Sequence, residues 1–159
     1  VREVASERDQ TFLVDGGSPA VLKISNAAED PAQLDMEALA AQWIAHVDPG
    51  VPVALPWLVP GTDDGYRAPL HRDGQTHWAR LYDRLPGHAR VLGATLSDEA
   101  VRGWGEMAAR VGRALRGFWH PAARRVMLWD VQHALRLRPM VGAVADPALR
   151  TLVHAALDG

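Results

Sequence analysis

The stretch Ala20-Val21-Leu22-Lys23-Ile24 places one cation in the centre of a β-rich run. Side chains alternate between the two faces of a strand, so Lys23 shares its face with Val21. The chain holds 17 Lys plus Arg residues, and Lys23 is its only lysine. Because a lysine ammonium is a compact point charge on a slim stem, it suits contact with a phosphate. The alternative interpretation is an ordinary lysine that faces solvent.

The residues on either side of this run predict two β-hairpins. The run Gln10–Val14 precedes it, and the turn Asp15-Gly16-Gly17-Ser18 joins the two runs. Residues 66–70 and 76–81 predict a second hairpin across an Asp73-Gly74 turn. Between the hairpins, Trp57-Leu58-Val59 predicts a short edge strand, because prolines flank it on both sides.

A helix is predicted from Pro31 to about Val47, with Asp30 as its N-cap and Gln33 placed to close a capping box. Its apolar stripe consists of Leu34, Ala38, Ala41 and Ile44. Glu37 lies on or beside this stripe, and a buried carboxylate needs a cation to neutralise it. We therefore expect an ion pair between Glu37 and Lys23. The alternative is a boundary glutamate that reaches solvent.

The second half of the chain changes to a helical period. A helix is predicted to follow Ser97, its N-cap, with apolar residues at intervals of three and four: Val101, Trp104, Ala108, Val111, Leu115 and Phe118. His120-Pro121 interrupts the pattern, a second helical stretch is expected around residues 128–140, and Asp146-Pro147 begins a third. Three tryptophans at helical spacing are expected to pack in the core: Trp43, Trp104 and Trp129. Strands followed by helices indicate an α+β fold, with its boundary near residues 86–97.

Composition excludes several classes of protein. Of 159 residues, 48% are hydrophobic, which suffices for a buried core without disulfides. A formal charge of −2 without runs of like charge argues against a nucleic-acid partner. No apolar stretch approaches the ~18 residues that a membrane span needs. The chain lacks cysteine, which fits a cytoplasmic location, and its 7 histidines lack metal-ligand spacing, so no metal site is expected.

Several motifs, taken in order, resemble the aminoglycoside phosphotransferase superfamily, which has a protein kinase-like fold. Ser6-Glu7-Arg8-Asp9-Gln10-Thr11-Phe12-Leu13-Val14, then Val21-Leu22-Lys23-Ile24-Ser25-Asn26 and Glu37, are similar to its N-terminal lobe, closest to the hydroxylysine kinase-like branch. Arg80-Leu81-Tyr82-Asp83-Arg84-Leu85-Pro86-Gly87 resembles the last strand of that lobe and its hinge. Phe118-Trp119-His120-Pro121-Ala122-Ala123 with Leu128-Trp129-Asp130 resembles the first helices of the C-terminal lobe.

The resemblance implies a kinase-like N-lobe over residues 1–86, with an antiparallel sheet of about five strands and one helix. A hinge over 87–96 and a partial, truncated helical C-lobe over 97–159 follow. A chain that begins with Val1 is expected to be a piece of a longer protein. The remaining C-lobe of the same polypeptide is then an expected partner.

The resemblance also implies an ATP site. Lys23 is expected at the α and β phosphates with Glu37 orienting it, and Val21 against the adenine. The residues Ser6, Glu7, Arg8 and Asp9 stand where protein kinases have a glycine-rich loop, and would use backbone N–H groups and the Ser6 hydroxyl. The adenine edge is expected to meet backbone groups of Tyr82, Asp83, Arg84 and Leu85, with Leu81 nearby.

Phosphoryl transfer in these folds uses a His-Gly-Asp motif for the base and later residues for magnesium, and residues 1–159 contain no His-Gly-Asp. Asp130 and Asp146 lie in helical contexts, so no catalytic residue is assigned. The Mg²⁺ ligands are expected only in the missing C-lobe, and this piece alone is expected to be inactive.

The implied function is the ATP-binding portion of a small-molecule kinase acting on a hydroxyl of an amino alcohol or hydroxylated amino acid. Proteins of this branch also occur fused to a class III pyridoxal-phosphate aminotransferase, so the parent could carry that second activity. The alternatives are a non-catalytic kinase-like module for interaction or regulation, and a plain α+β domain without a nucleotide site.

Overall fold

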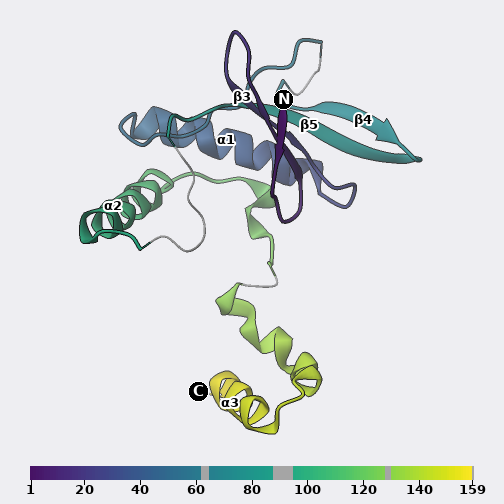
Figure 1. Ribbon diagram of the computed structural model, residues 1–159, viewed down its shortest axis with the longest axis vertical. Coiled ribbons are helices and arrows are strands. Elements are labelled where there is room, and N and C mark those ends of the chain that lie inside the picture. Colours follow the sequence, from purple (N-terminus) through teal and green to yellow (C-terminus); the bar gives the residue numbers. More distant parts are fainter. Residues whose placement is uncertain (62–64, 88–94, 128–129, 159) are drawn as a thin grey trace. The chain divides into compact units, whose positions relative to one another are not determined.

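The computed structural model describes residues 1–61, 65–87, 95–127 and 130–158. The chain divides into two compact units, Val1–Ala123 and Arg124–Gly159. The first unit contains the sheet and two α-helices, and the second contains short helical segments (Figure 1).

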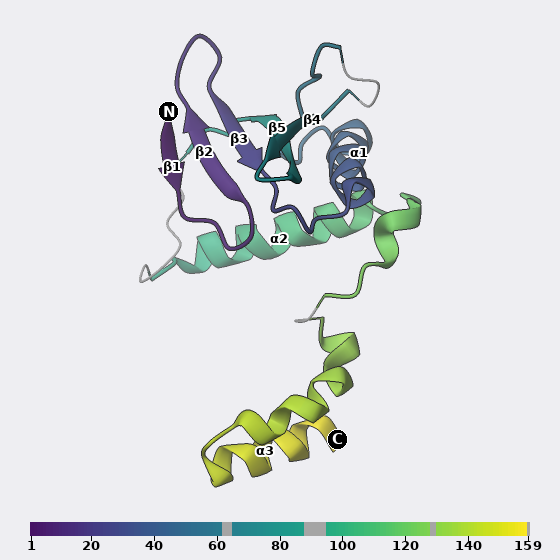
Figure 2. The ribbon, with the colours of Figure 1, turned by 90° about the vertical axis from the view of Figure 1, so that its right-hand side faces the viewer.

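One antiparallel sheet of five strands forms the centre of the first unit, as the family resemblance implied. The strands are β1 (Arg2–Val4), β2 (Gln10–Val14), β3 (Ala20–Ile24), β4 (Ala68–Arg72) and β5 (Gln75–Asp83). Their order across the sheet is β1-β2-β3-β5-β4 (Figure 2). Strand β3 is therefore central, and β5, distant in sequence, lies directly beside it.

The second hairpin forms across the expected turn but begins later than predicted. Strand β4 starts at Ala68 rather than at residue 66, and Arg72 pairs with Gln75. Asp73 and Gly74 have φ angles of 51° and 74°, so both turn residues are left-handed, as in a two-residue type I′ turn.

The edge strand predicted for Trp57-Leu58-Val59 is wrong. Pairing in this region is an isolated bridge between Pro56 and Tyr82, beside which the Trp57 N–H donates to the Leu81 carbonyl oxygen over 2.8 Å. Because proline has no N–H to donate, the prolines that flank this segment limit how far a ladder can extend.

Helix α1 (Pro31–Val47) has the bounds that the sequence predicted. The Asp30 side chain caps it by accepting from the Ala32 N–H over 2.9 Å. The most buried side chains of its apolar stripe are Leu34, Ala38 and Ile44. The helix lies alongside the sheet in both views (Figures 1 and 2). Its residue Glu37 accepts a hydrogen bond from Arg80 of β5, which identifies the face of the sheet that the helix covers.

Helix α2 (Asp98–Ala114) begins after the predicted N-cap, Ser97, but ends before Phe118. Gly117, with φ of 86°, leaves the helical conformation and terminates it. The C-terminal end of α2 packs on α1 through a core of Ile44, Val51 and Ala114. Trp43, predicted to be core, donates from Nε1 to the Ala114 carbonyl oxygen over 2.8 Å.

The N-terminal half of α2 does not bury its apolar face within the described residues. Trp104 is 71% exposed, so its predicted place in the core is wrong.

The C-terminal half of α2 is held to the end of α1 by an ion pair, in which Arg110 Nε donates to Asp48 over 2.9 Å. This hydrogen bond lowers the pKa of Asp48 below its usual value.

The second unit contains a 3₁₀ stretch, η2 (Val131–Ala143), and helix α3 (Pro147–Asp158), and the short η1 (Pro121–Arg124) spans the division. The helix expected around residues 128–140 is 3₁₀ from Val131 on, because Pro139 and the non-helical backbone of His133 interrupt it. Residues 128–129, including Trp129, lie outside the described residues. No helix in the described ranges is long and apolar enough to span a membrane.

Helix α2 belongs to the same compact unit as the sheet. The family resemblance instead assigns residues from 97 onward to a second lobe. Most of the predicted hinge, residues 88–94, lies outside the described ranges. The lobe boundaries therefore stay predictions.

Candidate functional site

The face of the sheet that α1 covers carries a row of polar residues across three strands. Lys23 on β3 lies directly opposite Thr11 on β2 and Arg80 on β5. The neighbouring row consists of Leu13, Val21 and Tyr82, on the same face. Directly opposed residues in an antiparallel sheet project from the same face. Val21 and Lys23 therefore share a face, as predicted, and Thr11, Arg80 and Tyr82 add polar groups to it.

The expected ion pair between Lys23 and Glu37 is wrong. The Lys23 ammonium instead lies 3.3 Å from an Asp9 carboxylate oxygen. The Glu37 carboxylate pairs with Arg80 over 2.8 Å. The physical reason is the register, because Arg80 occupies the position next to Lys23 on β5 and its longer, forked side chain reaches α1.

Lys23, Asp9, Arg80 and Glu37 form a charged cluster. Its most buried member is Arg80, whose side chain is 2% exposed. Its Nη1 donates to Glu37 Oε2 over 2.8 Å and to the Tyr82 hydroxyl over 2.9 Å. Its Nη2 donates to Asp9 Oδ2 over 3.2 Å. Burial acts to lower the pKa of Arg80, but Tyr82, Glu37 and Asp9 outweigh it, so the pKa lies above its usual value.

The charges of the cluster balance. Lys23 and Arg80 are opposed by Asp9 and Glu37, through ion pairs that join all four side chains. Like charges directly opposite each other on neighbouring strands are destabilising. The shared Asp9 carboxylate therefore offsets the repulsion between the two cations.

The loop before β2 is fixed by two successive residues. Arg8 donates to the buried Glu29 over 2.8 Å, and Asp9 contacts both Arg80 and Lys23. Ser6 and Glu7 precede them and are exposed. Of the loop residues predicted to face phosphates, Asp9 pairs with Lys23, whereas Arg8 pairs with Glu29.

The predicted adenine-edge segment is largely engaged within the chain. The Asp83 N–H donates to the Leu55 carbonyl oxygen over 2.9 Å, and the Arg84 N–H donates to the Pro19 carbonyl oxygen over 3.4 Å. The Arg84 guanidinium pairs with Asp15. The N–H groups of Asp83 and Arg84 therefore have partners within the chain, and the contact of Leu81 to Leu85 with an adenine edge stays a prediction.

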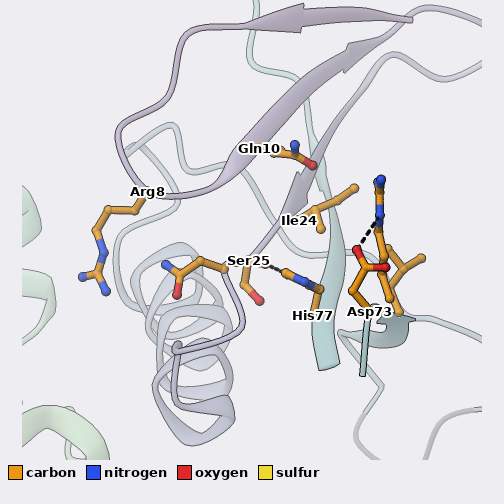
Figure 3. Close-up of a pocket in the computed structure, with 9 residues that line it drawn as sticks. Arg8, Gln10, Ile24, Ser25, Asp73 and His77 are labelled. Atoms are coloured by element: carbon orange, nitrogen blue, oxygen red, sulfur yellow. Dashed lines mark hydrogen bonds and ion pairs between the residues drawn. The ribbon is translucent and has the colours of Figure 1, made fainter. Parts of the chain in front are cut away.

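A pocket lies on the opposite face of the sheet. It measures about 370 Å³, and its lining includes Gln10, Ile24 and His77. Figure 3 shows these side chains beside Ser25, whose carbonyl oxygen is 2.8 Å from His77 Nδ1. Because Ile24 alternates with Lys23 along β3, this pocket is separate from the charged cluster.

The described residues contain no group of three or more His, Asp or Glu side chains that could hold a metal ion. The partly exposed cation Lys23 fits an anionic ligand, whereas Arg80 is buried against Asp9 and Glu37.

Comparison with known proteins connects this geometry to a family. The model of the phosphotransferase enzyme family matches residues 1–157. Among solved structures, the chain is similar to "Structure of the microcompartment-associated aminopropanol kinase", with a TM-score of 0.57 and 19% identity over 88% of this chain and 42% of that one. A search of curated proteins gave no match.

The sheet, its helix and this structural likeness define a kinase-like α+β fold. The chain belongs to the phosphotransferase enzyme family, which confirms the resemblance to the aminoglycoside phosphotransferase superfamily. It spans less than half the length of the aminopropanol kinase that it matches.

Sequence reasoning assigned Lys23, Asp9 and Glu37 to the candidate site but left Arg80 out of it. One signal was available, since Arg80 is a cation in the middle of the run Ala79-Arg80-Leu81-Tyr82, which otherwise reads as a strand. The richness of the chain in arginine hid this signal. The connection to Asp9 needed the cross-strand register, which alternation along one strand does not supply.

Proposed function

We propose that this chain forms the ATP-binding portion of a small-molecule kinase, with Lys23 as its contact to the α and β phosphates. The observation that carries the proposal is Lys23, whose side chain is 36% exposed and whose ammonium is paired with Asp9, on the sheet face that also bears Val21. An exposed cation held on a rigid strand is suited to a polyphosphate.

The neighbouring side chains support this assignment. Leu13 and Val21 are partly buried on the same face, beside Lys23, and offer an apolar surface for a purine ring. An ammonium has three N–H donors, so Lys23 can keep its contact with Asp9 and still donate to a phosphate.

The reaction that the proposal implies is transfer of the γ-phosphoryl group to a substrate hydroxyl. The bond between the γ-phosphorus and the bridging oxygen of ADP breaks, a bond to the hydroxyl oxygen forms, and the hydroxyl proton passes to a base. No residue of 1–159 is assigned as that base, and no Mg²⁺ ligand is assigned.

The proposed substrate class is an amino alcohol or a hydroxylated amino acid. Resemblance to the hydroxylysine kinase-like branch supports it, and the structurally similar kinase is named for aminopropanol, which is itself an amino alcohol. A class III aminotransferase in the same polypeptide is proposed from the resemblance alone.

Calorimetric titration of the chain with ATP tests the proposal. Lys23→Met should weaken ATP binding roughly 10- to 150-fold, the effect of one charge-assisted contact of about 1.5 to 3 kcal/mol. Arg72→Met is the matched control, because Arg72 is an exposed cation on β4 whose side chain is 79% exposed. It should bind ATP as the unsubstituted chain does.

Equal ATP affinity in the Lys23→Met variant and the unsubstituted chain would remove Lys23 from the site. Absence of ATP binding in the unsubstituted chain would contradict the proposal.

A further inference from the structure

A line of ion pairs connects helix α1 to the central strand. It runs from Glu37 to Arg80, from Arg80 to Asp9, and from Asp9 to Lys23, over 2.8, 3.2 and 3.3 Å. The side chains come from α1, β5 and the loop before β2, and the line ends at Lys23 on β3.

We propose that Arg80 is a positioning residue that fixes Lys23 for triphosphate binding through Asp9, and that Glu37 acts on Lys23 only through Arg80. This inference rests on the proposed function, because it assigns the role of Lys23 in ATP binding. Arg80 itself is 2% exposed and does not contact the ligand in this assignment.

The bonding of Arg80 argues against a role in stability alone. Its Nε is buried and has no hydrogen-bond partner among the described residues. An unsatisfied buried donor costs about 1 to 3 kcal/mol, and buried ion pairs often add little net stability over an apolar side chain. A residue of this kind, placed directly opposite Lys23, is better explained by the geometry that it imposes on its neighbours.

Asp9 is suited to transmit that geometry. Its side chain is 12% exposed, and the same carboxylate oxygen contacts Arg80 and Lys23. The ion pair of Arg8 with Glu29 anchors the adjacent residue of the loop. Lys23 therefore contacts a carboxylate that is held from two sides, while part of its own side chain stays open to a ligand.

Glu37 occupies the outer end of the line. Its side chain is 44% exposed, whereas the Arg80 side chain that it contacts is almost fully buried. Removal of Glu37 leaves the contact of Arg80 with Asp9 in place, because that contact uses the other terminal nitrogen of the guanidinium. Loss of Glu37 should therefore disturb Lys23 less than loss of Arg80 or Asp9.

A double-mutant cycle on ATP affinity tests the proposal. Arg80→Met should weaken ATP binding about 5- to 30-fold in the unsubstituted background and by less than about 2-fold in the Lys23→Met background. Arg80→Lys, which keeps the charge but not the fork that reaches two carboxylates, should lie between. Asp9→Asn provides a second, nearly isosteric variant if Arg80→Met fails to fold.

Arg67→Met is the matched control. Arg67 is also a poorly exposed arginine and pairs with Asp35 of the same helix over 2.8 Å. It should lose stability without changing ATP affinity by more than about 2-fold. Losses from Arg80→Met and Lys23→Met that simply add would overturn the proposal, as would an Arg80→Met variant that binds ATP like the unsubstituted chain.

A nucleotide-free measurement separates this proposal from the proposed function. Lys23 is the only lysine, so its side-chain Nζ and Cε resonances are assigned without ambiguity in a lysine-labelled sample. Arg80→Met and Asp9→Asn should move these resonances toward those of a free lysine, and Arg67→Met should not.

Unmoved Lys23 resonances in the Arg80→Met and Asp9→Asn variants would overturn the positioning role, whatever the ATP affinity. Moved resonances in a chain that binds no ATP would instead reject the proposed function while keeping the contact of Lys23 with Asp9.

Discussion

At the scale of single residues, Tyr82 connects the charged cluster to the apolar part of the same sheet face. Its hydroxyl accepts from Arg80 Nη1 over 2.9 Å, and it lies opposite Val21. Burial raises the pKa of Tyr82 above its usual value, against the opposing effect of the Arg80 charge. The folded chain therefore favours the neutral phenol.

This raised pKa predicts an alkaline loss of stability. An unfolded tyrosine ionises near pH 10, so the stability that neutral Tyr82 supplies is fully present below about pH 10 and is lost as the pH rises through the folded pKa. Tyr82→Phe lacks the hydroxyl bond and should be less stable at pH 8 by about 0.5 to 1.5 kcal/mol. The difference should shrink above pH 10.

Urea unfolding of both proteins at pH 8, 9, 10 and 11 measures this difference. Groups common to both proteins cancel in it, including Lys23. A constant difference across the series would contradict the burial of the phenol.

The residues of the site show what sequence reasoning can and cannot reach. Alternation along β3 correctly put Lys23 and Val21 on one face, because that depends on one strand alone. The partner of Lys23 depends on how β5 aligns with β3, and β5 is separated from β3 by α1 and β4. The sequence indicated that Glu37 needs a cation, and Arg80 supplies it in place of Lys23.

At the scale of elements, local signals predicted what local energetics decide. Helix α1 has the predicted bounds because Asp30 and Pro31 act within its first turn. The end of α2 was misplaced, because the apolar period continues through Leu115 and Phe118 while Gly117 terminates the helix. Periodicity does not report where the backbone turns left-handed.

The β4–β5 hairpin provides a test of that backbone requirement. Gly74 has φ of 74°, and no atom lies within 4 Å of the position that a Cβ would take. An added methyl group would therefore not clash with a neighbour, but it would strain the left-handed backbone. Gly74→Ala should destabilise the chain by about 1 to 2 kcal/mol.

Gly16→Ala is the control, because Gly16 has equally open surroundings without a left-handed φ. It should change the free energy of unfolding by less than about 0.5 kcal/mol. Equal effects of the two substitutions in urea unfolding would show that the turn does not hold Gly74 in the left-handed region.

At the scale of the whole molecule, the α+β class could be predicted from the order of strands and helices, and the family from motifs taken in order. The packing of α2 in the same unit as the sheet could not be predicted from the sequence. It depends on Ile44, Val51 and Ala114, which are brought together from separate segments. The exposure of Trp104 has the same origin, because amphipathic spacing shows that a face is apolar and does not show what covers it.

The two aspartates considered as possible bases have structural roles in the second unit. Asp130 caps η2 by accepting from the Gln132 N–H over 3.0 Å, and Asp146 accepts from the Ala148 N–H over 2.8 Å at the start of α3. A carboxylate that caps a helix is held as a hydrogen-bond acceptor by backbone N–H groups. Both carboxylates therefore have a structural explanation, and no base is assigned to either position.

The last prediction is that residues 1–159 bind ATP weakly and do not transfer its γ-phosphoryl group. Catalysis of this reaction is almost entirely positioning and electrostatic stabilisation, so a phosphate contact without a base and metal ligands yields no partial rate. The chain, with ATP, Mg²⁺ and a panel of amino alcohols that includes aminopropanol, should release no ADP above the buffer blank, while calorimetry on the same sample detects binding. ADP release that Lys23→Met abolishes would contradict this prediction and require a base within these residues.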